Sequence, residues 1–226
     1  MKKNNINKIL ALEKQGVKFI DNNKVDIRGE LICGTNVQID INVIFKGRVE
    51  LEDSVIIGSN TIINNSVIKS ESKIKDYSLI KNASVGKNCI IGPYARIRST
   101  SIIDNNSQVG NFVEIKNSTI GKNCRINHMA FLGDSTLEDN VTIGAGVITC
   151  NYDSHSTQKT YIESGSFIGS NVNLVAPIKI SKNSTIGSGS TITKNTPSNK
   201  LTVARSEQIS IDGWKGPRSK SSWLRP

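Results

Sequence analysis

The fold is decided by residues 91–121, IGPYARIRSTSIIDNNSQVGNFVEIKNSTIG, in which an aliphatic residue returns at every sixth position. The series is Ile91, Ile97, Ile103, Val109 and Ile115, and one step of five then leads to Ile120. A period of six fits neither the 3.6-residue repeat of a helix nor the two-residue alternation of a plain strand. It is typical of a hexapeptide repeat, in which each short strand forms one face of a coil.

The same six-residue series, with occasional steps of five, runs through most of the chain. We call the series a ladder and its aliphatic residues rungs. Its rungs outside the first stretch are Ile39, Phe45, Leu51, Ile57, Ile63, Ile68, Ile74, Ile80, Val85, Ile126, Leu132, Leu137, Ile143, Ile162, Ile168, Leu174, Ile180, Ile186 and Ile192. Small residues often stand two positions before a rung: Ser72, Ser78, Ala83, Cys89, Ala95, Ser101, Ser118, Cys124, Ala130, Ser166, Ser184 and Ser190. Gly often follows the rung, and Asn and Gly are suited to corners where φ is positive.

This pattern predicts an all-β fold, a parallel β-helix whose stacked coils bury a shared aliphatic column. Only 5% of the residues are aromatic, which agrees with a narrow prism that has room for Ile, Leu and Val but seldom for a ring. We expect a short lead-in helix and linker over residues 1–24 and the β-helix over 25–193. A polar loop is expected at 149–161, and a basic, irregular tail at 194–226. Long loops that leave a regular scaffold tend to carry function.

The chain of 226 residues has 29 Lys and Arg against 19 Asp and Glu, a net charge of +10 that points to anionic partners. None of the four cysteines forms a Cys-x-x-Cys pair, which argues against a disulfide framework and a cysteine-rich zinc site. No metal-ligand spacing is found, no apolar stretch reaches membrane-span length, and the basic residues are not interleaved with aromatics as in nucleic-acid binders. The amino-terminal segment is a poor signal peptide, so the cytoplasm is the expected compartment.

Few residues offer chemistry for catalysis. His128, one of two histidines, follows the rung Ile126 by two places, where the chain turns a corner, so it is either an exposed surface residue or a general base. Arg96, Arg98, Lys116, Lys122 and Arg125 place cations on the outside of neighbouring coils. They form either a solvated basic surface or a phosphate clamp, which requires two or three converging cations.

Five motifs carry a resemblance to a known family: GPYARIR (92–98), GNFVEIKNSTIG (110–121), NHMAFLGDS (127–135), IGAGVITCNYD (143–153) and NLVAPI (173–178). They resemble the C-terminal acetyltransferase domain of the bacterial bifunctional enzyme that makes UDP-N-acetylglucosamine. The likeness begins at VDIRG near Val25 and ends at DGWKGP (212–217). It implies a homotrimer of left-handed β-helices, with acetyl-CoA and the sugar bound between subunits. The implied reaction moves the acetyl group to the amine of glucosamine 1-phosphate.

The resemblance also implies roles for individual residues. His128 matches the catalytic base, and Glu114 matches the carboxylate associated with it. Substrate ligands are implied at Arg98, Lys116, Phe131, Thr142, Asn151, Tyr152 and Lys159. The acetyl-CoA side is implied at Ala145, Asn151, Tyr152, Ser170, Ser188 and Arg205, with Ser188 standing where alanine is usual. Acetyl-CoA is the expected co-substrate, and no metal is required.

Three acceptor-side positions depart from the family pattern. Phe131 replaces a tyrosine, Thr142 an asparagine, and Thr157 a lysine, although Lys159 lies two residues further on. Each change removes a hydrogen bond or a charge, worth about 1–3 kcal/mol where a partner is left unpaired. A different amino-sugar acceptor and a non-catalytic β-helix scaffold therefore stay open as alternatives. The family's uridyltransferase domain has no counterpart in this sequence, so the chain is either a stand-alone acetyltransferase or a fragment.

Overall fold

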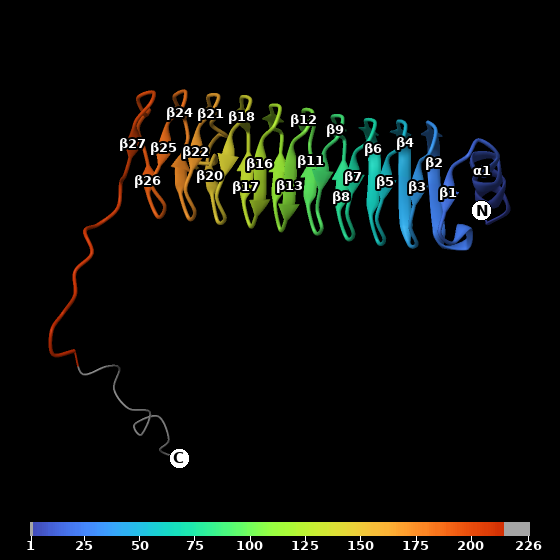
Figure 1. Cartoon of the computed structure of the whole chain (residues 1–226), viewed down its shortest axis with the longest axis horizontal. Helices are drawn as coiled ribbons and strands as arrows, with labels where there is room; N and C mark the ends of the chain where they lie inside the picture. The colour runs from blue at the N-terminus through green and yellow to red at the C-terminus, as the bar shows by residue number, and fades with distance from the viewer. Residues whose placement is uncertain (1, 215–226) are drawn as a thin grey trace, which may run out of the picture.

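A computed structural model describes residues 2–214 of the chain, with side chains from residue 5 onward. Figure 1 shows a long prism of stacked coils, with the helix α1 at one end and the strand β27 at the other. After β27 the described chain leaves the prism. Residues 1 and 215–226 lie outside the described part, and with them the end of the predicted tail and of the DGWKGP motif.

The helix α1 (Lys2–Lys14) covers the first coil. Its residues Ile9 and Leu12 are buried, and the Asn5 side chain pairs with the backbone at the outer edge of that coil. Asn5 Oδ1 accepts from Ile27 N at 2.8 Å, and Asn5 Nδ2 donates to Val25 O at 2.8 Å. A free strand edge is a template for unwanted pairing, so the helix closes an edge that the β-helix leaves open.

The first face of the prism is an 11-stranded parallel sheet. Its strands, in spatial order, are β1 (Lys18–Phe19), β3 (Gln38–Ile39), β5 (Ile56–Ile57), β7 (Lys73–Ile74), β10 (Ile90–Ile91), β13 (Gln108–Asn111), β16 (Arg125–His128), β19 (Thr142–Ile143), β22 (Phe167–Ile168), β25 (Thr185–Ile186) and β27 (Leu201–Thr202). A short 3₁₀ helix, η1 (Asn22–Lys24), leads from β1 to the next face.

The second and third faces are joined because three long strands turn the corner between them. These strands are β2 (Val25–Cys33), β4 (Val43–Leu51) and β6 (Ile62–Ile68). The second face continues from β6 through β8 (Leu79–Lys81), β11 (Arg96–Arg98), β14 (Glu114–Lys116), β17 (Phe131–Gly133), β20 (Ile148–Cys150), β23 (Asn173–Val175) and β26 (Thr191–Ile192). The third face continues through β9 (Ser84–Val85), β12 (Ile102–Ile103), β15 (Thr119–Ile120), β18 (Ser135–Leu137), β21 (Thr160–Ile162) and β24 (Ile178–Ile180).

The rung residues form the core, as the six-residue period predicts. Ile57 pairs with Ile74, Ile74 with Ile91, and Ile91 with Val109, so successive coils place rung above rung. Every predicted rung from Ile39 to Ile192 is buried, and so is every small residue predicted two places before a rung. The parallel β-helix is confirmed.

Corner positions explain the abundance of asparagine. Asn88, Asn106, Asn123 and Asn140 succeed one another at one corner, each with a positive φ between 53° and 61°. The Asn88 amide donates to Asn106 Oδ1, and the Asn123 amide donates to Asn140 Oδ1. Asn tolerates the left-handed region better than most residues, so the same side chain supplies both the corner geometry and a ladder of hydrogen bonds.

The regular ladder differs in extent from the sequence prediction. Strand β1 pairs with β3, and β27 pairs with β25, so coil structure is present on both sides of residues 25–193. In the polar loop, Thr149 and Cys150 belong to β20, and Thr160 and Tyr161 belong to β21. The excursion from the repeat is therefore residues 151–159, which are inserted where the second face meets the third.

Candidate active site

Two predicted phosphate-binding cations lie side by side on the second face. Arg98 on β11 is the register partner of Lys116 on β14. Arg98 Nε donates to Glu114 Oε1 at 2.6 Å, and Arg96 Nη1 lies 3.4 Å from Glu114 Oε2. Glu114 therefore holds the Arg98 guanidinium, and its predicted association with His128 stays a prediction.

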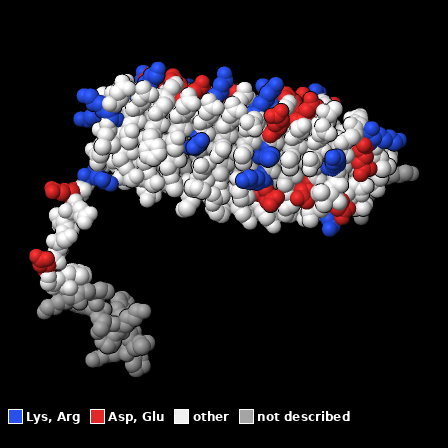
Figure 2. Space-filling view, viewed as in Figure 1, with Lys and Arg blue, Asp and Glu red and all other residues white. Residues whose placement is uncertain are grey.

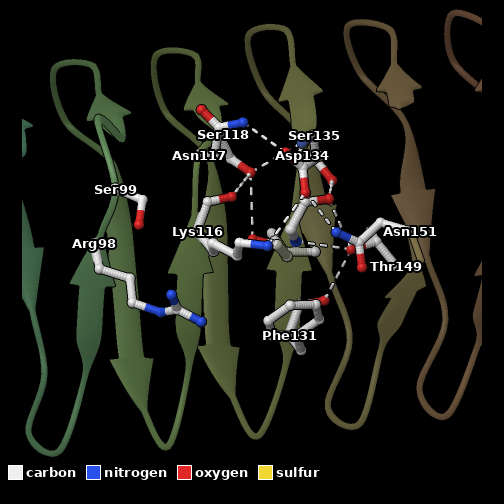
Figure 3. A network of polar contacts seen from close by, with 12 residues as sticks. Arg98, Ser99, Lys116, Asn117, Ser118, Phe131, Asp134, Ser135, Thr149 and Asn151 are labelled. Atoms are coloured by element: carbon white, nitrogen blue, oxygen red, sulfur yellow. Dashed lines mark hydrogen bonds and ion pairs between the residues drawn. The ribbon is translucent and has the colours of Figure 1, made fainter. Parts of the chain in front are cut away.

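The second cation, Lys116, has its own carboxylate, which sequence analysis missed. Lys116 Nζ lies 3.7 Å from Asp134 Oδ2, and the Asp134 side chain is only 8% exposed. Figure 3 shows Asp134 between Asn117 and Asn151, both of which donate to it. The distances are 2.5 Å from Asn117 Nδ2 to Oδ1 and 2.6 Å from Asn151 Nδ2 to Oδ2. Asp134 thus accepts hydrogen bonds from both amides and forms an ion pair with Lys116.

Phe131 lies next to this network. It is the register partner of Glu114 on one side and of Ile148 on the other. Its ring occupies the space beside Gly133, since a Cβ at Gly133 would lie 2.8 Å from both the ring and Asn151 Nδ2. The Gly133 amide donates to Thr149 Oγ1 at 2.8 Å. Glycine at position 133 therefore lets Phe131 and Asn151 approach each other.

His128 lies on another side of the prism, at the end of β16, and is exposed. Its side chain pairs with that of Asn111, with 2.8 Å between His128 Nδ1 and Asn111 Oδ1. A carbonyl oxygen only accepts, so this contact makes Nδ1 the protonated nitrogen of the neutral ring. Nε2 is then left with a lone pair, as a general base requires.

Three of the predicted cofactor-side residues, Ala145, Ser170 and Ser188, form one column with His128. The rungs Ile126, Ile143, Ile168 and Ile186 are paired in register, and the residues two places after them are His128, Ala145, Ser170 and Ser188. Ser188 Oγ lies 3.2 Å from Ser170 N, and Arg205 Nη1 donates to Ser188 O at 3.0 Å. The fold therefore places these side chains in a line along one corner of the prism.

The remaining predicted ligands are more scattered. Thr142 lies on the first face, on β19, where it pairs with Arg125 and Phe167. Tyr152 is exposed in the excursion and donates to Ser154 O at 3.1 Å, while Thr157 forms a bridge with Tyr152. Lys159 is exposed at the end of the excursion and lines a shallow depression of about 610 Å³ with Tyr161. The structure does not bring these side chains into the Asp134 network.

Burial makes the cysteines poor nucleophiles. Cys89 and Cys124 fill the small position beside the core, and their thiols lie 3.2 Å and 3.1 Å from the carbonyl oxygens of Asp104 and Glu138. Burial raises the pKa of Cys124 to about 11 and also raises the pKa of Cys89. Cys150, at the start of the excursion, also has its pKa raised by burial. A raised pKa lowers the thiolate fraction at neutral pH.

Other surface features lie apart from these residues. An apolar groove of about 510 Å³ between α1 and β2 contains none of the predicted site residues. Within residues 2–214, no cluster of three or more His, Cys, Asp or Glu has the arrangement of a metal site. In the same residues no helix is long and apolar enough to cross a membrane. On the face in Figure 2, positive and negative residues are interspersed toward the α1 end.

Asn111 and Asp134 are the two residues of the site that sequence analysis missed. Each lies one coil length away from a residue to which it is hydrogen-bonded. Asn111 precedes His128 by 17 residues, and Asp134 follows Asn117 by 17 residues, which is the length of a coil made of two six-residue steps and one five-residue step. Residues one coil apart lie above each other. Knowing whether a given coil has 17 or 18 residues would therefore have identified the partner of each polar side chain from the sequence.

Two family models match the chain. One, for bacterial transferase hexapeptide (six repeats), covers residues 159–194, and the other, for a GMPPB C-terminal domain, covers residues 27–119. The hexapeptide match and the coil geometry together define the class: the chain is a hexapeptide-repeat β-helix protein.

Curated relatives give the particular family. The bifunctional protein GlmU of Azoarcus sp. (strain BH72) is 46% identical over 206 residues, which is 91% of this chain and 46% of that protein. GlmU of Nitrosospira multiformis is 47% identical over 214 residues, covering 95% of this chain and 46% of that protein. The chain spans about half the length of the relatives it matches. It corresponds to the C-terminal domain of a GlmU-like protein.

A solved structure agrees on the fold. The UDP-N-acetylglucosamine acyltransferase of Bacteroides fragilis 9343 is 17% identical, with a TM-score of 0.53. The similarity covers 79% of this chain and 69% of the other. At that identity the likeness concerns the β-helix alone.

Proposed function

We propose that this protein is an acyltransferase that moves the acetyl group of acetyl-CoA to the amine of glucosamine 1-phosphate. The observation that carries the proposal is the pairing of an exposed, tautomer-fixed His128 with 46% identity to GlmU over 91% of the chain. The product would be N-acetylglucosamine 1-phosphate, and the other product free coenzyme A.

His128 supplies the acid–base chemistry in this proposal. The neutral amino group of the sugar attacks the thioester carbonyl, and His128 Nε2 accepts the proton that the nitrogen loses as the new bond forms. The new C–N bond forms as the carbonyl electron pair moves to oxygen. When the tetrahedral intermediate collapses, the C–S bond breaks, and the imidazolium returns the proton to the departing thiolate. Asn111 keeps the ring in the required tautomer throughout.

The developing oxyanion requires a hydrogen-bond donor. The Ala145 N–H has no hydrogen-bond partner within residues 2–214, whereas the next amide, Gly146 N, donates to Met129 O at 3.0 Å. Ala145 lies one coil from His128 in the same column. We therefore assign the oxyanion to the Ala145 amide, with Ser170, Ser188 and Arg205 extending the acetyl-CoA side along that column.

The sugar phosphate is assigned to the second face. Arg98 and Lys116 are register neighbours, and each is held by a carboxylate, Glu114 for Arg98 and Asp134 for Lys116. Two converging cations are the minimum for a phosphate clamp. Holding them in place before the ligand arrives reduces the side-chain entropy lost on binding.

The phosphate-side and base-side groups lie on different sides of one prism, which favours a site completed by a second subunit. The homotrimer therefore belongs to the proposal. So does a cytoplasmic location, where acetyl-CoA is available to the enzyme.

An acceptor panel tests the proposal. Thiol release from acetyl-CoA is measured with glucosamine 1-phosphate, with glucosamine, and with N-acetylglucosamine 1-phosphate, which has no free amine. We expect turnover with the first, a KM at least about tenfold higher with the second because the phosphate clamp is empty, and none with the third. Absence of turnover with glucosamine 1-phosphate contradicts the proposal.

One observation favours a second acceptor. The Phe131 ring lies beside Gly133 and offers no hydroxyl to a sugar. A sugar that lacks the corresponding hydrogen-bonding group would lose nothing there, so a deoxy or otherwise modified amino-sugar phosphate is the alternative. Higher kcat/KM for such an acceptor than for glucosamine 1-phosphate would establish it.

A further inference from the structure

Asp134 is a nearly buried carboxylate to which the function above gives no chemical step. It occupies a corner with φ of 50°, next in the column after Asn117, where φ is 47°. Asparagine fills many equivalent corners, and it tolerates this backbone conformation at least as well as aspartate. Backbone geometry therefore does not explain why residue 134 is a carboxylate.

The neighbours of Asp134 do explain it, because all of them donate. Asn117 Nδ2 donates to Asp134 Oδ1 at 2.5 Å, while the Thr100 hydroxyl, which lies 3.2 Å from Asn117 Oδ1, donates its single proton to Ser99 O at 2.6 Å. Asn151 Nδ2 approaches from the other side, and the Lys116 ammonium lies 3.7 Å from the same oxygen. An amide at position 134 would present an NH2 group to one of these donors, and two donors that face each other form no hydrogen bond.

The consequence for Asn151 is a fixed amide orientation. Its Nδ2 faces Asp134, and its Oδ1 has no hydrogen-bond partner within the described residues. The reverse orientation would place Oδ1 against a carboxylate oxygen, which is repulsive. The Asn151 oxygen is therefore available to accept from a ligand N–H or O–H, beside the ammonium of Lys116.

We propose that Asp134 is a positioning residue that locks Asn151 as a hydrogen-bond acceptor and Lys116 as a cation, so that together they recognise an amine-bearing sugar phosphate. The proposal deepens the proposed function and rests on it for the identity of the ligand. Figure 3 shows the arrangement, with Asp134 between the two side chains that it positions.

A polarity swap tests this role. In Asp134→Asn the introduced amide has one acceptor oxygen in place of two, so it cannot accept from both Asn117 and Asn151, and the Asn151 amide loses its fixed orientation. The swap combines Asp134→Asn with Asn151→Asp. In it, the amide introduced at position 134 accepts from Asn117 through its oxygen and donates through its nitrogen to the carboxylate introduced at position 151. That carboxylate again presents an acceptor to the ligand, and the charge of the pair is unchanged.

The chain offers a matched control for the single variant. Asp139 is also a corner carboxylate, and within the described residues its side chain accepts a hydrogen bond from the Lys122 backbone alone, at 2.7 Å. Asp139→Asn therefore removes a carboxylate from a corner of the same prism without touching Asn151 or Lys116.

We expect kcat/KM for glucosamine 1-phosphate to fall by at least about tenfold in Asp134→Asn and to return to within about threefold of the wild type in the swap. The control should stay within about twofold. Equal losses in Asp134→Asn and Asp139→Asn, or a folded swap that recovers nothing, would overturn the proposal. If Asp134→Asn alone does not fold, the proposal is tested by comparing kcat/KM of the folded swap with kcat/KM of the wild type.

A second measurement is independent of turnover. The Asn151 side-chain amide protons, assigned in ¹⁵N spectra by their loss in Asn151→Asp, should exchange at least about tenfold faster in Asp134→Asn than in the wild type, since they lose the carboxylate that protects them. Equal exchange rates would contradict the role of Asp134. A wild type that gives no turnover with glucosamine 1-phosphate while its amide is protected would contradict the proposed function and leave the positioning role supported.

Discussion

Asn111 Oδ1 lies 2.8 Å from His128 Nδ1, across adjacent coils in which the two residues are register partners. The side-chain oxygen of Asn111 accepts the Nδ1 proton and leaves Nε2 as the basic nitrogen. Asn111 therefore fixes both the tautomer and the direction of the imidazole ring.

This contact predicts the effect of removing Asn111. In Asn111→Ala the ring is free to rotate and to exchange tautomers, so kcat should fall about 10- to 100-fold, within the contribution expected of a general base. The melting temperature should change little, because the contact is exposed. Gln108→Ala, on the same strand, is the control and should retain kcat. Full activity of Asn111→Ala would show that His128 needs no fixed tautomer.

Adjacent isoleucines on β12 give a matched test of the core. Ile103 is a rung with 1% exposure, whereas Ile102 is 49% exposed. Ile103→Ala should lower the free energy of unfolding by about 2–5 kcal/mol, through lost burial and a cavity that stacked coils cannot close. Ile102→Ala should lower it by less than about 1 kcal/mol. Urea unfolding followed by circular dichroism measures both, and similar losses would contradict the rung assignment.

An aromatic stack at the corner between the first and second faces makes a further prediction. Tyr94 lies between Tyr77 and Phe112, with ring centroids 5.0 Å and 5.2 Å apart. The φ angle of Tyr94 is 55°, a backbone conformation that is strained for most residues. The stacking contacts therefore form in spite of this strain. Tyr94→Ala loses two stacking contacts, about 0.5–1.5 kcal/mol each, and keeps the backbone strain. Tyr94→Asn should be the more stable variant, since Asn suits this conformation. Thermal melts compare the two, and a more stable alanine variant would contradict the strain argument.

The excursion should loosen in acid. Backbone N–H groups of Ser156 and His155 donate to Asp153 Oδ1 and hold its pKa below its usual value of 3.8. A lowered pKa means that the carboxylate stabilises the loop at pH above the usual value, and that this contribution disappears as the pH falls through the lowered value. The amide signals of His155 and Ser156 should therefore shift as the pH falls below the usual value. Asp153→Asn should show the shifted signals already at neutral pH, and pH-independent signals in the wild type would contradict this account.

The fold was predictable because its main determinant is local. A rung such as Ile97 and its small neighbour Ala95 repeat at a spacing that only a hexapeptide coil satisfies, and both are buried as predicted. The pairing of polar residues was harder, since it depends on where a coil has 17 residues and where it has 18. One position of error moves Asn111 away from His128, and the same uncertainty hid Asp134 beneath Asn117.

The direction of individual side chains was the second feature of the site that could not be predicted from the sequence. Asn151 was predicted as a ligand from its motif, and its nearly buried amide is held by Asp134, which lies one 17-residue coil earlier; the spacing gives the neighbour but not the direction of the amide. The association of Glu114 with His128 that the motif implies stays a prediction, and within one chain the carboxylate pairs with Arg98 and Arg96 on its own face. Charge neutralisation between neighbouring strands decides such contacts, and it becomes visible only in the assembled sheet.

The most direct test of the account is acetyl transfer by the wild type and by His128→Ala, with coenzyme A release and N-acetylated product quantified together. The account predicts equimolar release and product in the wild type with glucosamine 1-phosphate, and a kcat lower by about 10²- to 10⁴-fold in a His128→Ala variant that melts at the wild-type temperature. Wild-type turnover in the folded variant, or none in the wild type, would contradict it.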